Sequence, residues 1–114
     1  MPADCLFCRI AAGEIPATKV HEDDLVFAIR DINPQAPTHV LVMPLAHVVS
    51  AADLTEADAP LLGRLFSVAA GLARSEGVDG GWRLVSNVGP DGGQSVDHLH
   101  MHLLGGRPMT WPPG

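Results

Sequence analysis

Three histidines, His98, His100 and His102, are separated by single apolar residues near the carboxyl end of the chain. Side chains two positions apart on a β-strand project to the same side, so a strand over residues 96–104 would place the three imidazoles on one face and the apolar side chains toward a core. Half of the six histidines of the chain lie in this stretch. Because imidazole serves as a metal ligand and a proton carrier near neutral pH, the stretch predicts a functional site.

A glycine-rich segment, residues 87–95, leads into the histidines. It combines glycines with polar residues, and backbone N–H groups in such a loop can come close enough to bind a phosphate. The same residues also suit an ordinary hairpin loop. Since only two residues, Val96 and Asp97, separate the loop from His98, we expect the loop donors and the imidazoles to converge on one site.

Three interpretations of the histidine strand follow from the residues alone. Two of the histidines could bind catalytic zinc with a third ligand from elsewhere. One imidazole could instead attack phosphorus as a nucleophile while its neighbours bind phosphate oxygens. The third interpretation is a module that binds a nucleotide without chemistry. The glycine-rich loop favours phosphate over a bare metal site, and the only nearby carboxylate, Asp97, has the opposite parity.

The segment Gly93-Gln94-Ser95-Val96 followed by the alternating histidines closely resembles the signature of the histidine triad family. Further segments across nearly the whole chain resemble the Hint branch: Glu14-Ile15-Pro16-Ala17, Asp31-Ile32, Pro34-Gln35-Ala36-Pro37-Thr38-His39 and Trp111-Pro112-Pro113-Gly114. This resemblance implies a homodimeric purine nucleoside phosphoramidase that hydrolyses adenosine or guanosine 5′-phosphoramidates, including lysyl adenylates. The alternatives are a dinucleoside polyphosphate or nucleotidyl hydrolase of the same superfamily, and a nucleotide-binding sensor or scaffold with incidental turnover.

Matching positions give each histidine an implied role. His100 is implied as the nucleophile that forms a nucleotidyl-histidine, and His102 as a contact to the α-phosphate. His98 would orient the site from behind. Ser95 would protonate the departing amine or hold a phosphate oxygen. The implied reaction is two-step and requires no metal cofactor.

The resemblance also implies residues that bind the nucleotide. Asp31 resembles the family's ribose-binding acid, Phe7 and Ile32 resemble the apolar walls around the purine, and Asn87 would contact the ribose-phosphate region. Gly93 and Gln94 belong to the implied phosphate loop. From the residues alone, Asp31 could simply cap a turn, and Phe7 and Ile32 could be core. His21 and His39 are expected to have no part in the function.

Cys5 and Cys8 form a C-x-x-C pair close to the N-terminus. Such a pair can be half of a zinc site, a redox pair, or two small buried cysteines. No strand is expected before it, which argues against the redox form. Some bacterial histidine triad proteins bind structural zinc with such a pair and two histidines, which by position would be His47 and His98. Closed Cys₂His₂ coordination would leave no position for substrate, so this zinc would be structural.

Several sequential strands and one long helix must position these residues. Strands are expected at residues 18–21, 25–29, 39–43, 82–86 and 96–104. A helix is expected to begin at Thr55, with Asp58 completing a capping box, and to end at Gly77. Its apolar stripe comprises Leu61, Leu62, Leu65, Phe66, Ala69, Leu72 and Ala73. This order predicts an antiparallel α+β fold, and the resemblance implies a five-stranded sheet, one long helix and a short N-terminal helix.

Composition excludes several classes of protein. The 114 residues are expected to form one histidine triad domain, residues 1–114. Seven basic and thirteen acidic residues give a net charge of −6, and no basic cluster suggests a nucleic-acid partner. No apolar run reaches membrane-spanning length, and the N-terminus does not resemble a signal peptide, so the expected location is the cytoplasm.

Overall fold

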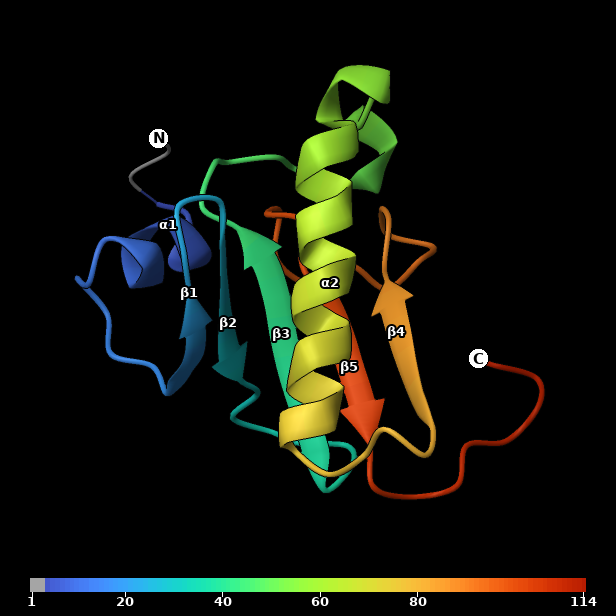
Figure 1. Cartoon of the computed structure of the whole chain (residues 1–114). Helices are drawn as coiled ribbons and strands as arrows, with labels where there is room; N and C mark the ends of the chain where they lie inside the picture. The colour runs from blue at the N-terminus through green and yellow to red at the C-terminus, as the bar shows by residue number, and fades with distance from the viewer. Residues whose placement is uncertain (1–3) are drawn as a thin grey trace.

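The computed structural model describes residues 4–114. It shows a five-stranded antiparallel sheet with one long helix packed on one face (Figure 1). The strands are β1 (Lys19–Glu22), β2 (Val26–Arg30), β3 (Thr38–Pro44), β4 (Trp82–Ser86) and β5 (Met101–Gly105), in the spatial order β1-β2-β3-β5-β4. The helices are α1 (Leu6–Ala11) and α2 (Ala59–Ser75), with 3₁₀ turns at Ala51–Asp53 and Glu56–Asp58. The predicted α+β fold is confirmed. No helix in residues 4–114 is both long and apolar enough to cross a membrane.

The central strands are buried on both faces, because α2 covers one face and α1 packs against the other. Alternate residues of β2, β3 and β5, such as Val26, Val40 and Leu103, form one core with the apolar stripe of α2. The intervening residues Phe27 and Leu41 form a second core with α1. The sheet therefore separates a layer that contains α2 from a layer that contains α1 (Figure 1).

The start of α2 follows the predicted capping chemistry, displaced by one turn. The Thr55 hydroxyl accepts from the backbone N–H of Ala57, and the Asp58 carboxylate accepts from the backbone N–H of Thr55. This capping box closes the 3₁₀ turn, and α2 itself begins at Ala59. The placement of Phe66 in the core is wrong: its side chain is 51% exposed. The buried stripe runs through Leu65, Val68, Ala69, Leu72 and Ala73, and Phe66 lies about 100° around the helix from Leu65.

The last strand is shorter than predicted. Ladder pairing with β3 begins at Val42 opposite Met101, so residues 96–100 precede β5. An extended ladder would pair Met43 with His100 and then Pro44 with Leu99, but Pro44 has no N–H and its carbonyl already accepts from the His98 ring at 2.8 Å. The Leu99 backbone N–H instead donates to the Val48 carbonyl. The stretch that carries His98 is thus held by the Pro44 carbonyl at the end of β3 and by Val48 just after it.

Close packing at Gly105, in β5, gives a test of this core. A Cβ at this position would lie 2.8 Å from Val78 Cγ2 and 2.9 Å from Val78 Cβ. We expect Gly105→Ala to lower the free energy of unfolding by about 1–3 kcal/mol through overpacking. The control is Gly63→Ala on α2, where no atom lies within 4 Å of the added Cβ and helix propensity predicts a gain of about 0.5–1 kcal/mol. Urea unfolding measures both, and equal midpoints for the two variants would contradict this account of the packing.

Candidate active site

All three histidines of the alternation project away from the α2 layer. Leu99, Met101 and Leu103 contribute to the core beneath α2. His98 is fully buried, His100 is 5% exposed and His102 is half-buried in β5. The two-residue period therefore holds through residues 98–103, although ladder pairing covers only the last part of it. The backbone places the imidazoles on the side of the sheet where α1 lies.

The hydrogen bond made by His100 Nδ1 determines whether the other ring nitrogen, Nε2, carries a proton in the neutral ring. His100 Nδ1 lies 2.7 Å from the His98 carbonyl oxygen, which can only accept, so Nδ1 carries the proton. In the neutral ring, Nε2 then has a free lone pair. The edge of Phe7, from α1, packs against this imidazole with ring centroids 5.1 Å apart. Together these contacts hold a buried imidazole with an unprotonated Nε2.

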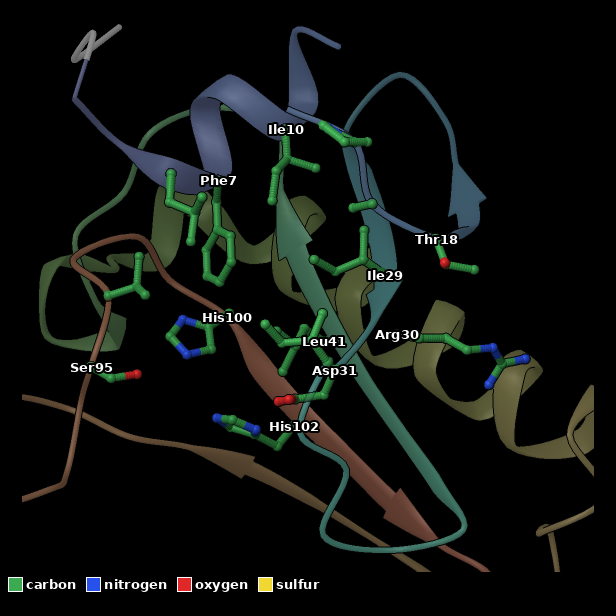
Figure 2. Close-up of a pocket in the computed structure, with 15 residues that line it drawn as sticks. Phe7, Ile10, Thr18, Ile29, Arg30, Asp31, Leu41, Ser95, His100 and His102 are labelled. Carbon is green, nitrogen blue, oxygen red and sulfur yellow. The ribbon is translucent and has the colours of Figure 1, made fainter. Parts of the chain in front are cut away.

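A pocket of about 710 Å³ opens beside His100 and His102. Figure 2 shows His100, His102, Ser95 and Asp31 gathered around one part of it. The other part is lined mainly by apolar side chains from α1, β2, β3 and the segment between α1 and β1: Leu6, Phe7, Ile10, Pro16, Ala17, Ile29 and Leu41. Ile32, which is fully exposed, borders the pocket as well. An apolar cavity next to several polar groups can bind a planar ring and present an attached polar group to the imidazoles.

Behind the pocket, the predicted cysteines and histidines lie together. The ligand atoms of Cys5, Cys8, His47 and His98 are all within 4.8 Å of one another. The Sγ to Nδ1 distances are 3.4 Å for Cys5–His98, 3.4 Å for Cys8–His47 and 3.6 Å for Cys8–His98. Tetrahedral zinc with bonds of about 2.3 Å to sulfur and 2.0 Å to nitrogen places such atoms about 3.5 Å apart. The four side chains therefore have the spacing of a Cys₂His₂ metal site.

The protonation of this cluster is consistent with metal binding. His98 Nε2 donates to the Pro44 carbonyl, so the lone pair of Nδ1 faces the two sulfurs. Burial lowers the pKa of His98, which keeps the ring in the neutral form that binds metals. Burial, with the adjacent Cys5, raises the pKa of the Cys8 thiol to about 11. Without a cation the thiol is protonated at neutral pH, and a bound metal would displace that proton.

Comparison with known proteins supports the likeness seen in the sequence. The family model described as the HIT domain matches residues 12–109. The chain belongs to the HIT family. A 14 kDa zinc-binding protein of Zea mays is 50% identical over 96% of this chain and 87% of its own length. The crystal structure of a HIT family hydrolase from Legionella pneumophila Philadelphia 1 superposes with a TM-score of 0.95 and 54% identity, covering 97% of this chain and 100% of that one. A histidine triad nucleotide-binding protein from Candida albicans has a TM-score of 0.82 at 30% identity, covering 96% and 83%.

Most of the residues predicted in the glycine-rich loop of this HIT protein, residues 87–95, do not line the pocket. Ser95 lines the pocket, whereas Asn87, Gly93 and Gln94 are not among its lining residues. The Asn87 side chain donates to the Gly92 carbonyl. Gln94 accepts from the Gly89 N–H and donates to the carbonyls of Val49 and Val96. In this structure these side chains shape the loop that carries Ser95.

One residue of the HIT protein's site, His39, is not predicted from the sequence. Its Nε2 lies 2.9 Å from His102 Nδ1 and 3.4 Å from the Asp31 carboxylate. The two-residue period of β3 could have indicated its role. His39 lies on the same face of β3 as Leu41, and Leu41 pairs directly with His102. Using that signal requires knowing that β3 and β5 are neighbours, which the sequence alone does not establish.

Proposed function

We propose that this HIT protein is a purine nucleoside phosphoramidase, which hydrolyses adenosine or guanosine 5′-phosphoramidates through a nucleotidyl-His100 intermediate. The observation that carries the proposal is the hydrogen bond from His100 Nδ1 to the His98 carbonyl, which leaves Nε2 as the lone-pair nitrogen of the neutral ring beside a pocket with both apolar and polar parts. The names of two relatives, a HIT family hydrolase and a histidine triad nucleotide-binding protein, agree with this class of reaction. The apolar part would hold the purine, and the Asp31 carboxylate would accept from the ribose hydroxyls.

The proposed reaction has two displacements at phosphorus. The lone pair of His100 Nε2 attacks phosphorus, the phosphorus–nitrogen bond to the amine breaks, and the amine leaves with a proton supplied through Ser95. His102 stabilises the negative charge on the phosphate oxygens. Water then attacks the same phosphorus and breaks its bond to His100, the proton that this water loses returns to Ser95, and the nucleoside monophosphate is released. Nδ1 keeps its proton in both steps, because the His98 carbonyl accepts from it throughout.

The proposed role of Ser95 predicts a dependence on the leaving group. Ser95→Ala should lower kcat by about 10²-fold for a phosphoramidate of an alkylamine, whose departure requires a proton. An aryl ester of AMP with an acidic phenol provides the comparison, because the phenol leaves as its anion and needs no proton. For this substrate, Ser95→Ala should lower kcat much less. Steady-state kinetics on both substrates measure the difference. Equal losses on the two substrates would show that Ser95 does not protonate the leaving group.

A substrate comparison tests the proposal itself. The purified protein should hydrolyse adenosine 5′-phosphoramidate to AMP and ammonia with a higher kcat/KM than it shows for a dinucleoside polyphosphate. The opposite order would favour the polyphosphate hydrolase alternative. Nucleotide binding without turnover of either substrate would favour a sensor or scaffold, and would overturn the phosphoramidase assignment.

We infer that Cys5, Cys8, His47 and His98 hold a structural zinc ion. Support comes from the tetrahedral spacing of the four ligand atoms and from the name of the maize relative, which is a zinc-binding protein. Zinc bound there would cross-link α1 to the segment after β3, which carries His47, and to the segment before β5, which carries His98. All four donors come from the protein, so the ion supplies rigidity and takes no part in the displacements.

We also propose that the protein is a homodimer. Sheet order leaves β4 at an edge, and the α2 residue Phe66 is 51% exposed. A second copy could pair with the edge strand and cover Phe66. Sedimentation equilibrium should give twice the 12.0 kDa mass of the chain, and a monomer at micromolar concentration would contradict this proposal.

A further inference from the structure

The loop between β2 and β3 presents an oriented donor to His39. This loop is closed by a hydrogen bond from the Asp31 N–H to the His39 carbonyl at 3.0 Å and by one from the Asn33 N–H to the Asp31 carboxylate at 2.8 Å. Within it, the Gln35 backbone N–H lies 3.0 Å from His39 Nδ1. A backbone N–H can only donate, so His39 Nδ1 must accept and carries no proton.

The tautomer of His39 then determines the tautomer of His102. A neutral imidazole has one N–H, so the proton of His39 lies on Nε2. This atom is 2.9 Å from His102 Nδ1, which must therefore accept. The Asp31 carboxylate, 3.4 Å from His39 Nε2, favours a proton at that nitrogen. By the same reasoning, the proton of neutral His102 lies on its own Nε2.

Burial supports the neutral state of both rings. It lowers the pKa of His39, against the opposing effect of Asp31. Burial also lowers the pKa of His102, and the neighbouring His100 and His39 lower it further. His100 and His102, with ring centroids 5.1 Å apart, thus have opposite tautomers: His100 has a lone pair at Nε2, and His102 has an N–H there.

We propose that His39 is a positioning residue that fixes His102 as a hydrogen-bond donor to the substrate's phosphate, through a chain of two hydrogen bonds that begins at the Gln35 backbone N–H. The role of His102 toward phosphate rests on the proposed function, whereas the chain of hydrogen bonds does not require it. If His102 had the other tautomer, it would turn a lone pair toward the phosphate oxygens and lose the attraction that stabilises their charge. Residues that orient a metal-binding histidine through its second ring nitrogen affect activity by about 10–100-fold, and we expect an effect of the same order for His39.

Two substitutions of His39 separate this role from simple packing. His39→Gln places an amide NH₂ near the position of Nε2, so it keeps a donor for His102. His39→Asn places its amide near Nδ1, so it can still pair with the Gln35 N–H but does not reach His102. We expect His39→Asn to lower kcat for adenosine 5′-phosphoramidate by about 10–100-fold with a small change in KM, and His39→Gln to recover most of that loss. Equal losses for the two variants, or none for His39→Asn, would overturn the proposal.

The imidazole ¹⁵N chemical shifts of the nucleotide-free protein test the tautomer directly. In the parent protein and in His39→Gln, His102 should have a protonated Nε2 and an unprotonated Nδ1, whereas His39→Asn should give averaged shifts. A protonated His102 Nδ1 in the parent would overturn the proposal whether or not the variants fold. These spectra need no substrate, so a parent that has the expected tautomers but does not hydrolyse phosphoramidates would contradict the proposed function alone.

Discussion

Replacing His100 with alanine should lower kcat for adenosine 5′-phosphoramidate by about 10⁴-fold or more, because the variant lacks the atom that attacks phosphorus. The pocket would otherwise keep its polar groups, His102, Ser95 and Asp31, and its apolar lining. Nucleotide binding should therefore change much less than turnover. Steady-state rates together with calorimetric titration of AMP measure the two effects separately.

His21→Ala is the matched control for this experiment. His21 lies on β1 and pairs with Asp23 at 2.6 Å, on a part of the chain that does not line the pocket. Its removal should leave kcat and KM unchanged. Acid quenching during turnover should also trap the nucleotide on the parent protein and not on His100→Ala. A folded His100→Ala that hydrolyses the substrate at the parent's rate would exclude the nucleotidyl-histidine mechanism.

The second large effect is expected from the cysteine–histidine cluster. Substitution of both Cys5 and Cys8 by serine should abolish binding of the proposed zinc ion and lower the free energy of unfolding by about 3–5 kcal/mol, because binding to the folded site contributes directly to folding. For a chain of this size, that corresponds to a fall in Tm of about 10–20 °C. Metal analysis and differential scanning calorimetry measure the two quantities.

A chelator provides the control. It should lower the Tm of the parent protein toward that of the double serine variant, and it should leave the Tm of the variant unchanged. Adding zinc back to the metal-free parent should release protons, since burial and Cys5 raise the pKa of the Cys8 thiol to about 11. A parent protein that is purified without zinc, or whose Tm does not respond to the chelator, would contradict the structural role of the metal.

Local patterns predicted much of the arrangement of this site. Alternation alone predicted that Leu99 and Leu103 face a core and the histidines the other side, because the two-residue period of an extended chain does not depend on its partners, and the structure shows that this core lies under α2. The capping box at Thr55 and Asp58 is likewise a local interaction. These features could be read from fewer than ten consecutive residues.

The residue pattern alone predicted contacts between distant segments poorly, and it was the family resemblance that grouped Cys5 and Cys8 with His47 and His98. The upstream limit of β5 is set by Pro44 and by the bond between its carbonyl and the His98 ring, which are 54 positions apart. The partner of His102, His39, is 63 positions away. Neither pair has a local signal. The error at Phe66 has a different origin, because an apolar residue beside the buried stripe of a helix is not distinguished from one within it by hydrophobicity alone.

The division of the molecule by its sheet has a consequence for how it tolerates mutation. Side chains of β2 and β3 alternate between the α2 layer and the layer that holds α1 and the pocket. Substitutions on the α2 side should change the fraction of molecules that are folded while leaving the KM of each folded molecule intact. Substitutions at neighbouring positions on the other side should alter both. In a mutational scan, the effect of substitution on substrate affinity should therefore alternate from one residue to the next along each central strand. A library of substitutions confined to the α2 side could raise stability without reshaping the pocket.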